Sequence, residues 1–221
     1  MSGPSLYDYK PANYHGYARI NLLELLDSGI ESVLDVGCGE GNNTAYLRSK
    51  GVKEIWGVEM SASAAELAKQ QMDYVYMGTI ESFFESEHVE NRFDLIILGD
   101  VLEHLINPWL VLKQLTGLLS KNGQILISLP NIRNMGVLVP LLIKGEWRYE
   151  MSGILDNTHL RFFTYKSAVR MIHDAGLFVA KVSSNRFGGK RGVFNRLTLG
   201  LFKDFFITQH YFLCRQGKPE R

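Results

Sequence analysis

A glycine-rich turn between an apolar run and a helical pattern constrains this chain more than any other feature. Segment 33–43 reads VLDVGCGEGNN, with glycines at positions 37, 39 and 41. Glycines at such a turn let a ligand approach the backbone closely, and the helix that follows offers free N–H groups at its start. Glu59 lies 22 residues after Gly37, at the end of the next apolar run, where a carboxylate can accept both hydroxyls of a ribose. The first sixty residues therefore predict a pocket for a nucleoside-bearing cofactor.

Asp35 narrows the choice of cofactor. It precedes the first glycine by two residues, so its carboxylate is expected beside the loop. A pyrophosphate would meet a like charge there, whereas S-adenosylmethionine (SAM) carries an ammonium and a sulfonium and no phosphate. Asn42 also stands where the dinucleotide-binding pattern has its third glycine. These residues favour SAM over a nicotinamide dinucleotide. The alternative is that Asp35 and the glycines form a tight turn without a ligand.

Three motifs resemble those of class I SAM-dependent methyltransferases. Segments 35–41, 57–59 and 93–104 are similar to the family's first, second and fourth motifs. The resemblance implies an α/β, Rossmann-like class I methyltransferase fold with a mostly parallel seven-stranded sheet and an antiparallel last strand. It also implies a set of cofactor-binding residues: Asp35, Gly37, Cys38, Gly39, Glu59, Met60, Thr79, Ile80, Gly99 and Asp100. Many relatives carry an acid in place of Thr79 to receive the adenine amino group, so this chain departs from the family there.

Outside these motifs, segments 128–131 and 153–164 resemble a subgroup that is often found with glycosyltransferases in polysaccharide synthesis. This resemblance suggests a sugar or glycan acceptor. It says less about the substrate than the glycine loop says about the cofactor, because a fold carries many functions.

Apolar runs alternate with helical patterns along the chain, which indicates βαβ units and a parallel sheet. We expect strands near 32–36, 54–58, 73–77, 93–98, 124–129, 177–182 and 208–214. Helices are expected over 17–28, from Pro108 to a break at 122–123, and from 164 to 176. Residues 1–221 are expected to form one methyltransferase domain. Within it, 1–18 is interpreted as an N-terminal lid and 130–163 as a substrate lid, although 136–143 could equally be a packing or dimer segment.

Composition limits the partners. The chain has 221 residues, is 46% hydrophobic and carries a net charge of +1, which gives no general attraction to nucleic acid. Residues 181–221 nevertheless hold nine Lys or Arg against two Asp or Glu, a run that could face an anionic substrate or be a solvated surface. Two cysteines fit neither a disulfide framework nor a zinc site, which predicts a cytoplasmic protein. The longest apolar run is too short to span a bilayer, which leaves peripheral contact with a membrane open.

A second cluster carries the candidate catalytic residues. Asp100, Glu103 and His104 have a spacing that places them on one face of a helical turn, and His159 follows 55 residues after His104. The pattern resembles the magnesium-binding set of plant small-RNA 2′-O-methyltransferases and of ubiquinone-biosynthesis O-methyltransferases, with Asp100 in place of a Glu. It implies Mg²⁺ as a possible cofactor, held by Asp100, Glu103, His104 and His159. Two alternatives remain. His104 or His159, with Asp100 beside them, could act as a metal-free general base, or the cluster could serve helix capping and packing.

Together these observations predict a SAM-dependent methyltransferase that methylates a hydroxyl of a sugar or another small polar molecule. One alternative is an RNA-modifying methyltransferase, which would need the basic tail as its binding surface. The other is a SAM-binding scaffold without turnover. The acidic and histidine residues on the acceptor side disfavour that second alternative, because a scaffold has no use for them.

Overall fold

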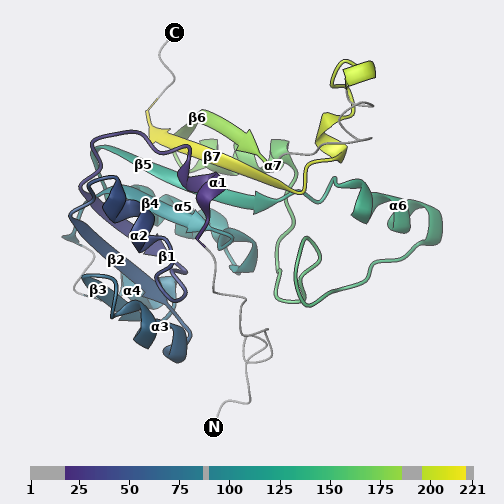
Figure 1. Cartoon of the computed structure of the whole chain (residues 1–221). Coiled ribbons are helices and arrows are strands. Elements are labelled where there is room, and N and C mark those ends of the chain that lie inside the picture. The colour runs from purple at the N-terminus through teal and green to yellow at the C-terminus, as the bar shows by residue number, and fades with distance from the viewer. Residues whose placement is uncertain (1–17, 87–89, 186–195, 218–221) are drawn as a thin grey trace.

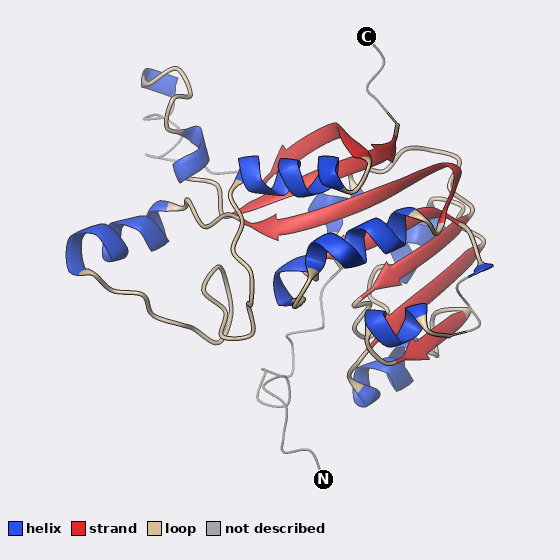
Figure 2. Cartoon of the chain, turned by 180° about the vertical axis from the view of Figure 1, so that it is seen from behind, coloured by secondary structure: helices blue, strands red, loops and turns tan. Residues whose placement is uncertain are grey.

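The computed structural model describes residues 18–86, 90–185 and 196–217. The predicted N-terminal lid, apart from Ala18, lies outside these residues, as does part of the basic tail. The described part of the chain folds around one seven-stranded sheet, which Figures 1 and 2 show from its two sides. The strands are β1 (Ser32–Val36), β2 (Glu54–Glu59), β3 (Tyr74–Met77), β4 (Phe93–Gly99), β5 (Leu119–Pro130), β6 (Leu177–Ser184) and β7 (Gln209–Gln216).

Strand order confirms the predicted topology. The sheet runs β3-β2-β1-β4-β5-β7-β6, and β1 to β5 pair in parallel. β7 pairs antiparallel with both β5 and β6. The order reverses at β1, between β2 and β4, which is the switch point where open α/β sheets bind their ligands.

Helices cover both faces of the sheet, because the inner strands are buried on both sides. Along β1, Leu34 and Val36 pack on one face and Val33 on the other, as the period of two requires. The first face is covered by α4 (Ile80–Phe84), α5 (Pro108–Thr116) and α7 (Tyr165–Asp174). The second face is covered by α1 (Ile20–Leu23), α2 (Thr44–Ser49) and α3 (Ala62–Ala68). Among the described helices, none is long and apolar enough to cross a membrane.

The expected helix over 17–28 was wrong, since α1 spans four residues. Arg19 occupies the N-cap position but makes no side-chain capping bond. Its backbone N–H instead donates to Asn43 Oδ1 (3.0 Å), and its guanidinium pairs with Asp100. The start of α1 is therefore set by the contacts of Arg19 with Asn43 and Asp100. Only Leu22 and Leu23 of α1 are buried.

The predicted helix break at 122–123 was also wrong. α5 ends at Thr116 and β5 begins at Leu119, so both residues lie within a strand. The pairing of β4 with β5 shifts register between Phe93 and Leu95. A Cβ on Gly123 would lie 2.9 Å from the Phe93 carbonyl oxygen, so the glycine permits close strand approach at a bulge.

The insertion between β5 and α7 contains an additional helix, α6 (Met135–Lys144). Asn134 caps its start, accepting from the Gly136 N–H, and Gly145 ends it with φ +64°. In both views α6 extends beyond the end of the sheet, and the remainder of the insertion returns to the sheet edge (Figures 1 and 2). The segment interpreted as a lid therefore has two parts, a projecting helix and a returning loop.

Candidate active site

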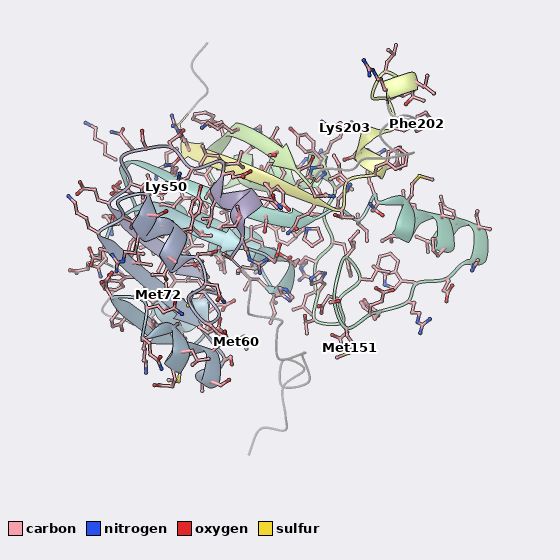
Figure 3. All side chains as sticks on the ribbon, viewed as in Figure 1. Lys50, Met60, Met72, Met151, Phe202 and Lys203 are labelled. Carbon is pink, nitrogen blue, oxygen red and sulfur yellow. The ribbon has the colours of Figure 1, made fainter. Side chains whose placement is uncertain are left out.

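A cavity of about 760 Å³ opens at the carboxyl ends of β1, β2 and β4. It contains nine of the ten predicted cofactor residues: Gly37, Cys38, Gly39, Glu59, Met60, Thr79, Ile80, Gly99 and Asp100. Met60, labelled in Figure 3, follows the last residue of β2. The same cavity also includes Glu103, His104 and His159. One cavity thus contains both the cofactor motifs and the cluster of Glu103, His104 and His159, which we call the acceptor cluster.

Glu59 holds the glycine loop in place. Its side chain is 5% exposed, with Oε2 accepting from the Gly39 N–H (2.9 Å) and Oε1 from the Ser61 N–H (2.8 Å). Gly37 and Gly39 adopt φ +67° and +56°, which glycine reaches without strain. The carboxylate therefore bridges the loop after β1 to the start of α3, and each oxygen keeps lone-pair capacity toward the cavity.

Asp35 lies behind the cavity wall rather than in it. Its side chain is 2% exposed, and Asn43 Nδ2 donates to Asp35 Oδ2 (2.9 Å). Asn43 itself lines the cavity, so Asp35 acts on the pocket through this amide. Burial raises the pKa of Asp35 to about 6, with Glu59 raising it further and Asn43 and Arg19 opposing the shift.

Thr79 caps α4 in addition to lining the cavity. Its Oγ1 accepts from the Ser82 N–H (3.2 Å), which satisfies the end of a helix. This is the position where many relatives of the resembled family carry an acid. The hydroxyl is committed to the helix, so any contact of Thr79 with a nucleobase would use its remaining hydrogen-bonding capacity.

Asp100 is fixed by three partners in an unusual backbone conformation. Its φ is +57°, a left-handed value that side chains other than glycine rarely adopt. The carboxylate accepts from Ser128 Oγ (2.6 Å), from Gln209 Nε2 and from the guanidinium of Arg19. Sequence reasoning missed Arg19 and Gln209, because they lie 81 and 109 residues away from Asp100 and belong to no motif.

The acceptor cluster combines Glu103, His104 and His159. One ligand atom from each residue can be chosen so that all three lie within 4.8 Å of one another. The two imidazole rings are 4.7 Å apart between centroids, and His159 Nε2 lies 3.9 Å from Glu103 Oε1. Asp100, which the sequence placed in this set, is not part of it. The φ of Asp100 and its three partners keep its carboxylate with Ser128, Gln209 and Arg19.

Two backbone carbonyls fix the orientation of the histidines. His104 Nδ1 lies 3.2 Å from the Thr158 carbonyl oxygen, and His159 Nδ1 lies 3.0 Å from that of Ile154. A carbonyl can only accept, so each Nδ1 carries the proton and each neutral ring keeps a lone pair on Nε2. Burial, with the neighbouring His159, lowers the pKa of His104 to about 4. His104 is therefore neutral at physiological pH.

Glu103 is the least satisfied group of the site. Its side chain is 1% exposed, and neither carboxyl oxygen has a hydrogen-bond partner among the described residues. Its backbone carbonyl, in contrast, accepts from the N–H groups of Leu160 and Arg161 (2.8 and 3.0 Å), which ties it to the insertion. Burial, and then the charge of Asp100, raise the pKa of the Glu103 carboxyl well above its usual value.

A family model described as a methyltransferase domain matches residues 12–182. The chain belongs to this methyltransferase family. As the fold and the family agree with the predicted cofactor, it is a SAM-dependent methyltransferase.

Curated relatives of this methyltransferase are named ubiquinone biosynthesis O-methyltransferase. The one from Shewanella halifaxensis is 24% identical over 207 residues, covering 91% of this chain and 86% of the relative. The one from Glaesserella parasuis is 27% identical, covering 65% of this chain and 64% of the relative. Among solved structures, a SAM-dependent methyltransferase from Archaeoglobus fulgidus is 16% identical with a TM-score of 0.66, covering 90% of this chain and 91% of that one. This last likeness concerns the fold.

Proposed function

We propose that this methyltransferase transfers the methyl group of SAM to a hydroxyl of a small molecule bound beside Glu103, His104 and His159. The observation that carries the proposal is the presence of this cluster in the same cavity as the Glu59 loop. The names of the curated relatives also support O-methylation, although an identity near 25% does not identify the acceptor.

The residues of the cofactor side fit SAM. Glu59 would accept the ribose hydroxyls, as an acid at the end of the second strand does in nucleotide-binding folds. Arg19 would hold the carboxylate of the methionine part, and it is the only Lys or Arg among the described lining residues. The charge of Asp35, acting through Asn43, would favour the ammonium. When bound, SAM supplies an electrophilic methyl group, which leaves a hydroxyl acceptor with a proton to lose.

His104 and His159 are suited to remove that proton. Both rings are held with Nδ1–H toward a carbonyl, so Nε2 offers its lone pair to a hydroxyl. The depressed pKa keeps His104 unprotonated and ready to act as a base near neutral pH. His159 has the carboxyl of Glu103 near its Nε2, a carboxyl that can receive or share the proton in the buried site.

The same three residues also fit a divalent cation, which is the second candidate mechanism. The specific observation is Glu103, a buried carboxyl with no hydrogen-bond partner among the described residues, beside two imidazoles whose Nδ1 atoms face backbone carbonyls. Glu103, His104 and His159 would hold the cation, which lowers the pKa of an acceptor hydroxyl when bound. Two nitrogens and one carboxylate suit a transition-metal ion or Zn²⁺ better than Mg²⁺, which prefers oxygen ligands.

The cavity favours a small acceptor over RNA. Its lining offers Arg19 as its one strong cation among the described residues, and Asp100 already accepts from that guanidinium. RNA binding is dominated by phosphate contacts, which need several such cations. A sugar hydroxyl and a phenolic hydroxyl both suit the proposed chemistry. The sugar acceptor remains a prediction from the sequence resemblance.

The test is release of S-adenosylhomocysteine (SAH) from SAM with a panel of sugars, catechols and single-stranded RNA, with and without a chelator. We expect turnover with a sugar or a catechol and none with RNA. Activity that persists in chelator selects the general base, and activity that the chelator abolishes and zinc or manganese restores selects the cation. Turnover with RNA alone would overturn the proposed acceptor class. SAM binding without turnover on any compound would favour the scaffold.

A further inference from the structure

Helix α6 is apolar on every side and yet largely exposed. Its sequence is MGVLVPLLIK, and of its residues Val137 alone is buried. Leu142 and Ile143 are 78% and 77% exposed. A helix that is hydrophobic all round is normally buried, because each exposed apolar side chain forgoes the free energy of leaving water. The exposed face of α6 is therefore not explained by the packing of the described chain.

Residues 196–203 form a second exposed apolar segment, which extends beyond the same end of the sheet as α6 (Figure 1). Leu197, Leu199 and Leu201 are 77%, 96% and 78% exposed. Leu199 also has φ +50°, a left-handed conformation that disfavours a bulky side chain and favours glycine or asparagine. Neither the packing of the described residues nor the backbone conformation calls for leucine at this position, so its exposed side chain is available for a contact.

Polar contacts tie the two segments into one surface. Arg133, just before α6, pairs with Asp204 (2.7 Å) and lies over the ring of Phe205 (4.6 Å). Asn134, the cap of α6, donates to the Ile207 carbonyl oxygen (3.0 Å). Figures 1 and 2 show both segments extending beyond the same end of the sheet, and Figure 3 labels Phe202 and Lys203 there. We call α6 and residues 196–203 the apolar face.

The charges of this face are all of one sign. Residues 131–145 and 196–203 contain Arg133, Lys144, Arg196 and Lys203, and no Asp or Glu. Two acids flank these ranges: Asp204, which follows Lys203, is paired with Arg133, and Glu146 follows Gly145. A second copy of the chain would bring like charges together in a twofold interface, which disfavours a dimer. Apolar side chains flanked by Lys and Arg instead match the boundary between acyl chains and anionic headgroups.

We propose that the apolar face docks on an anionic lipid bilayer. The side chains of Leu142, Ile143 and Leu199 enter the boundary between headgroups and acyl chains, while Lys144 and Lys203 contact the anionic headgroups. α6 projects beyond the end of the sheet, which leaves its apolar side chains accessible to a membrane surface (Figures 1 and 2). This surface is separate from the cavity residues that carry the proposed methyl transfer, so it can be tested without an acceptor.

The test is co-sedimentation of the full chain with vesicles. We expect binding to vesicles of phosphatidylcholine and phosphatidylglycerol in equal parts, and little binding to phosphatidylcholine alone. Leu142→Ser combined with Ile143→Ser should weaken the partition coefficient about tenfold or more, because two apolar side chains no longer leave water. Lys144→Gln combined with Lys203→Gln should weaken it about tenfold, and added salt should do the same to the wild type.

Leu110→Ser provides the matched control, because Leu110 is 52% exposed on α5, away from the apolar face. It should bind vesicles as the wild type does, and circular dichroism should show that every variant is folded. Equal binding to both vesicle types, no binding to either, or equal loss in the Leu110 control would overturn the proposal. Sedimentation equilibrium decides the remaining case. A wild-type dimer that the Leu142→Ser, Ile143→Ser variant dissolves would assign the face to a second copy.

Discussion

The buried carboxyls on the cofactor side and on the acceptor side of the cavity differ in their hydrogen bonding. Glu59 accepts from two backbone N–H groups, and Asp35 accepts from Asn43. Glu103, a few ångströms from His159, has no hydrogen-bond partner on either oxygen among the described residues. A buried carboxyl left without a partner costs about 1–3 kcal/mol or more. The cofactor side is thus held in shape by its own hydrogen bonds, whereas the acceptor side keeps its hydrogen-bonding capacity for something that binds.

This difference separates binding from chemistry. A cofactor loop that is preorganised loses little conformational entropy when SAM binds. In the acceptor cluster, the Glu103 carboxyl has no hydrogen-bond partner among the described residues, so it gains an interaction when a proton, a cation or an acceptor arrives. Changes on one side should therefore alter SAM affinity, and changes on the other should alter turnover.

The largest effect is expected from the histidines. His104→Ala and His159→Ala should each reduce turnover by about a hundredfold or more, because a general base contributes on that scale. SAM affinity should change less than about twofold, since neither ring belongs to the cofactor loop. Turnover is measured as SAH release and affinity by calorimetry. His173→Ala, an exposed histidine on α7, is the matched control and should leave both unchanged. Full activity in both variants would return the cluster to a structural role.

The next largest effect is expected from substitution of Glu59. Glu59→Ala removes an acceptor of charge-assisted hydrogen bonds, so SAM affinity should fall at least about tenfold. The exposed Glu66→Ala on α3 serves as the control for loss of a negative charge. Calorimetry that found the same SAM dissociation constant in wild type and Glu59→Ala would remove Glu59 from the cofactor site.

Glu103→Gln should stabilise the protein at neutral pH by about 1 kcal/mol, because it removes the cost of burying an ionisable carboxyl that has no hydrogen-bond partner among the described residues. The pKa of Glu103 is raised in the folded state, so the unfolded state loses its proton first as pH rises. The free energy of unfolding of the wild type therefore falls as pH rises above the pKa of Glu103 in the unfolded state. The Gln variant has no such pH-dependent loss. Urea unfolding at pH 5 and pH 8 should show the advantage of the variant growing with pH. An advantage independent of pH would indicate that Glu103 has a partner.

The smallest effect is expected from Asp35. Because its pKa is raised to about 6, its carboxylate gains charge between pH 5 and 7. SAM carries an ammonium, so its affinity should rise about threefold to tenfold over this range in wild type. Asp35→Asn should show a flatter profile. Titrations with SAM at several pH values provide the measurement, and identical slopes in the two proteins would exclude a charge effect of Asp35.

The sequence predicted the parts of this fold that depend on local pattern. β1 and β2 follow short, mostly apolar runs, and the glycines of the loop adopt positive φ angles that few other residues adopt. It did not predict the short α1, whose start is fixed by contacts of Arg19 with Asn43 and Asp100. Such contacts join residues far apart in the chain and have no spacing that a motif could record.

The acceptor cluster shows the same division. The sequence predicted Glu103, His104 and His159 as members of one set, and the fold brings His159 to the other two from the returning loop of the insertion. The direction of Asp100 was not predictable, because it depends on a φ of +57° and on Gln209 from the last strand. Asn134 and Gly145 flank α6 as its N-cap and C-terminal glycine and could have indicated the helix, but the sequence analysis interpreted its apolar run only as part of a lid or as a packing or dimer segment.

The central claim is that Glu59 serves the cofactor and His159 serves the acceptor. The most direct measurement is the single-turnover rate of Glu59→Ala and His159→Ala at rising SAM concentration, with the acceptor on which the wild type is active. We expect saturating SAM to restore Glu59→Ala to within about threefold of wild type, whereas His159→Ala stays about a hundredfold slow. Restoration of His159→Ala by SAM, or a Glu59→Ala rate that SAM does not raise, would contradict it.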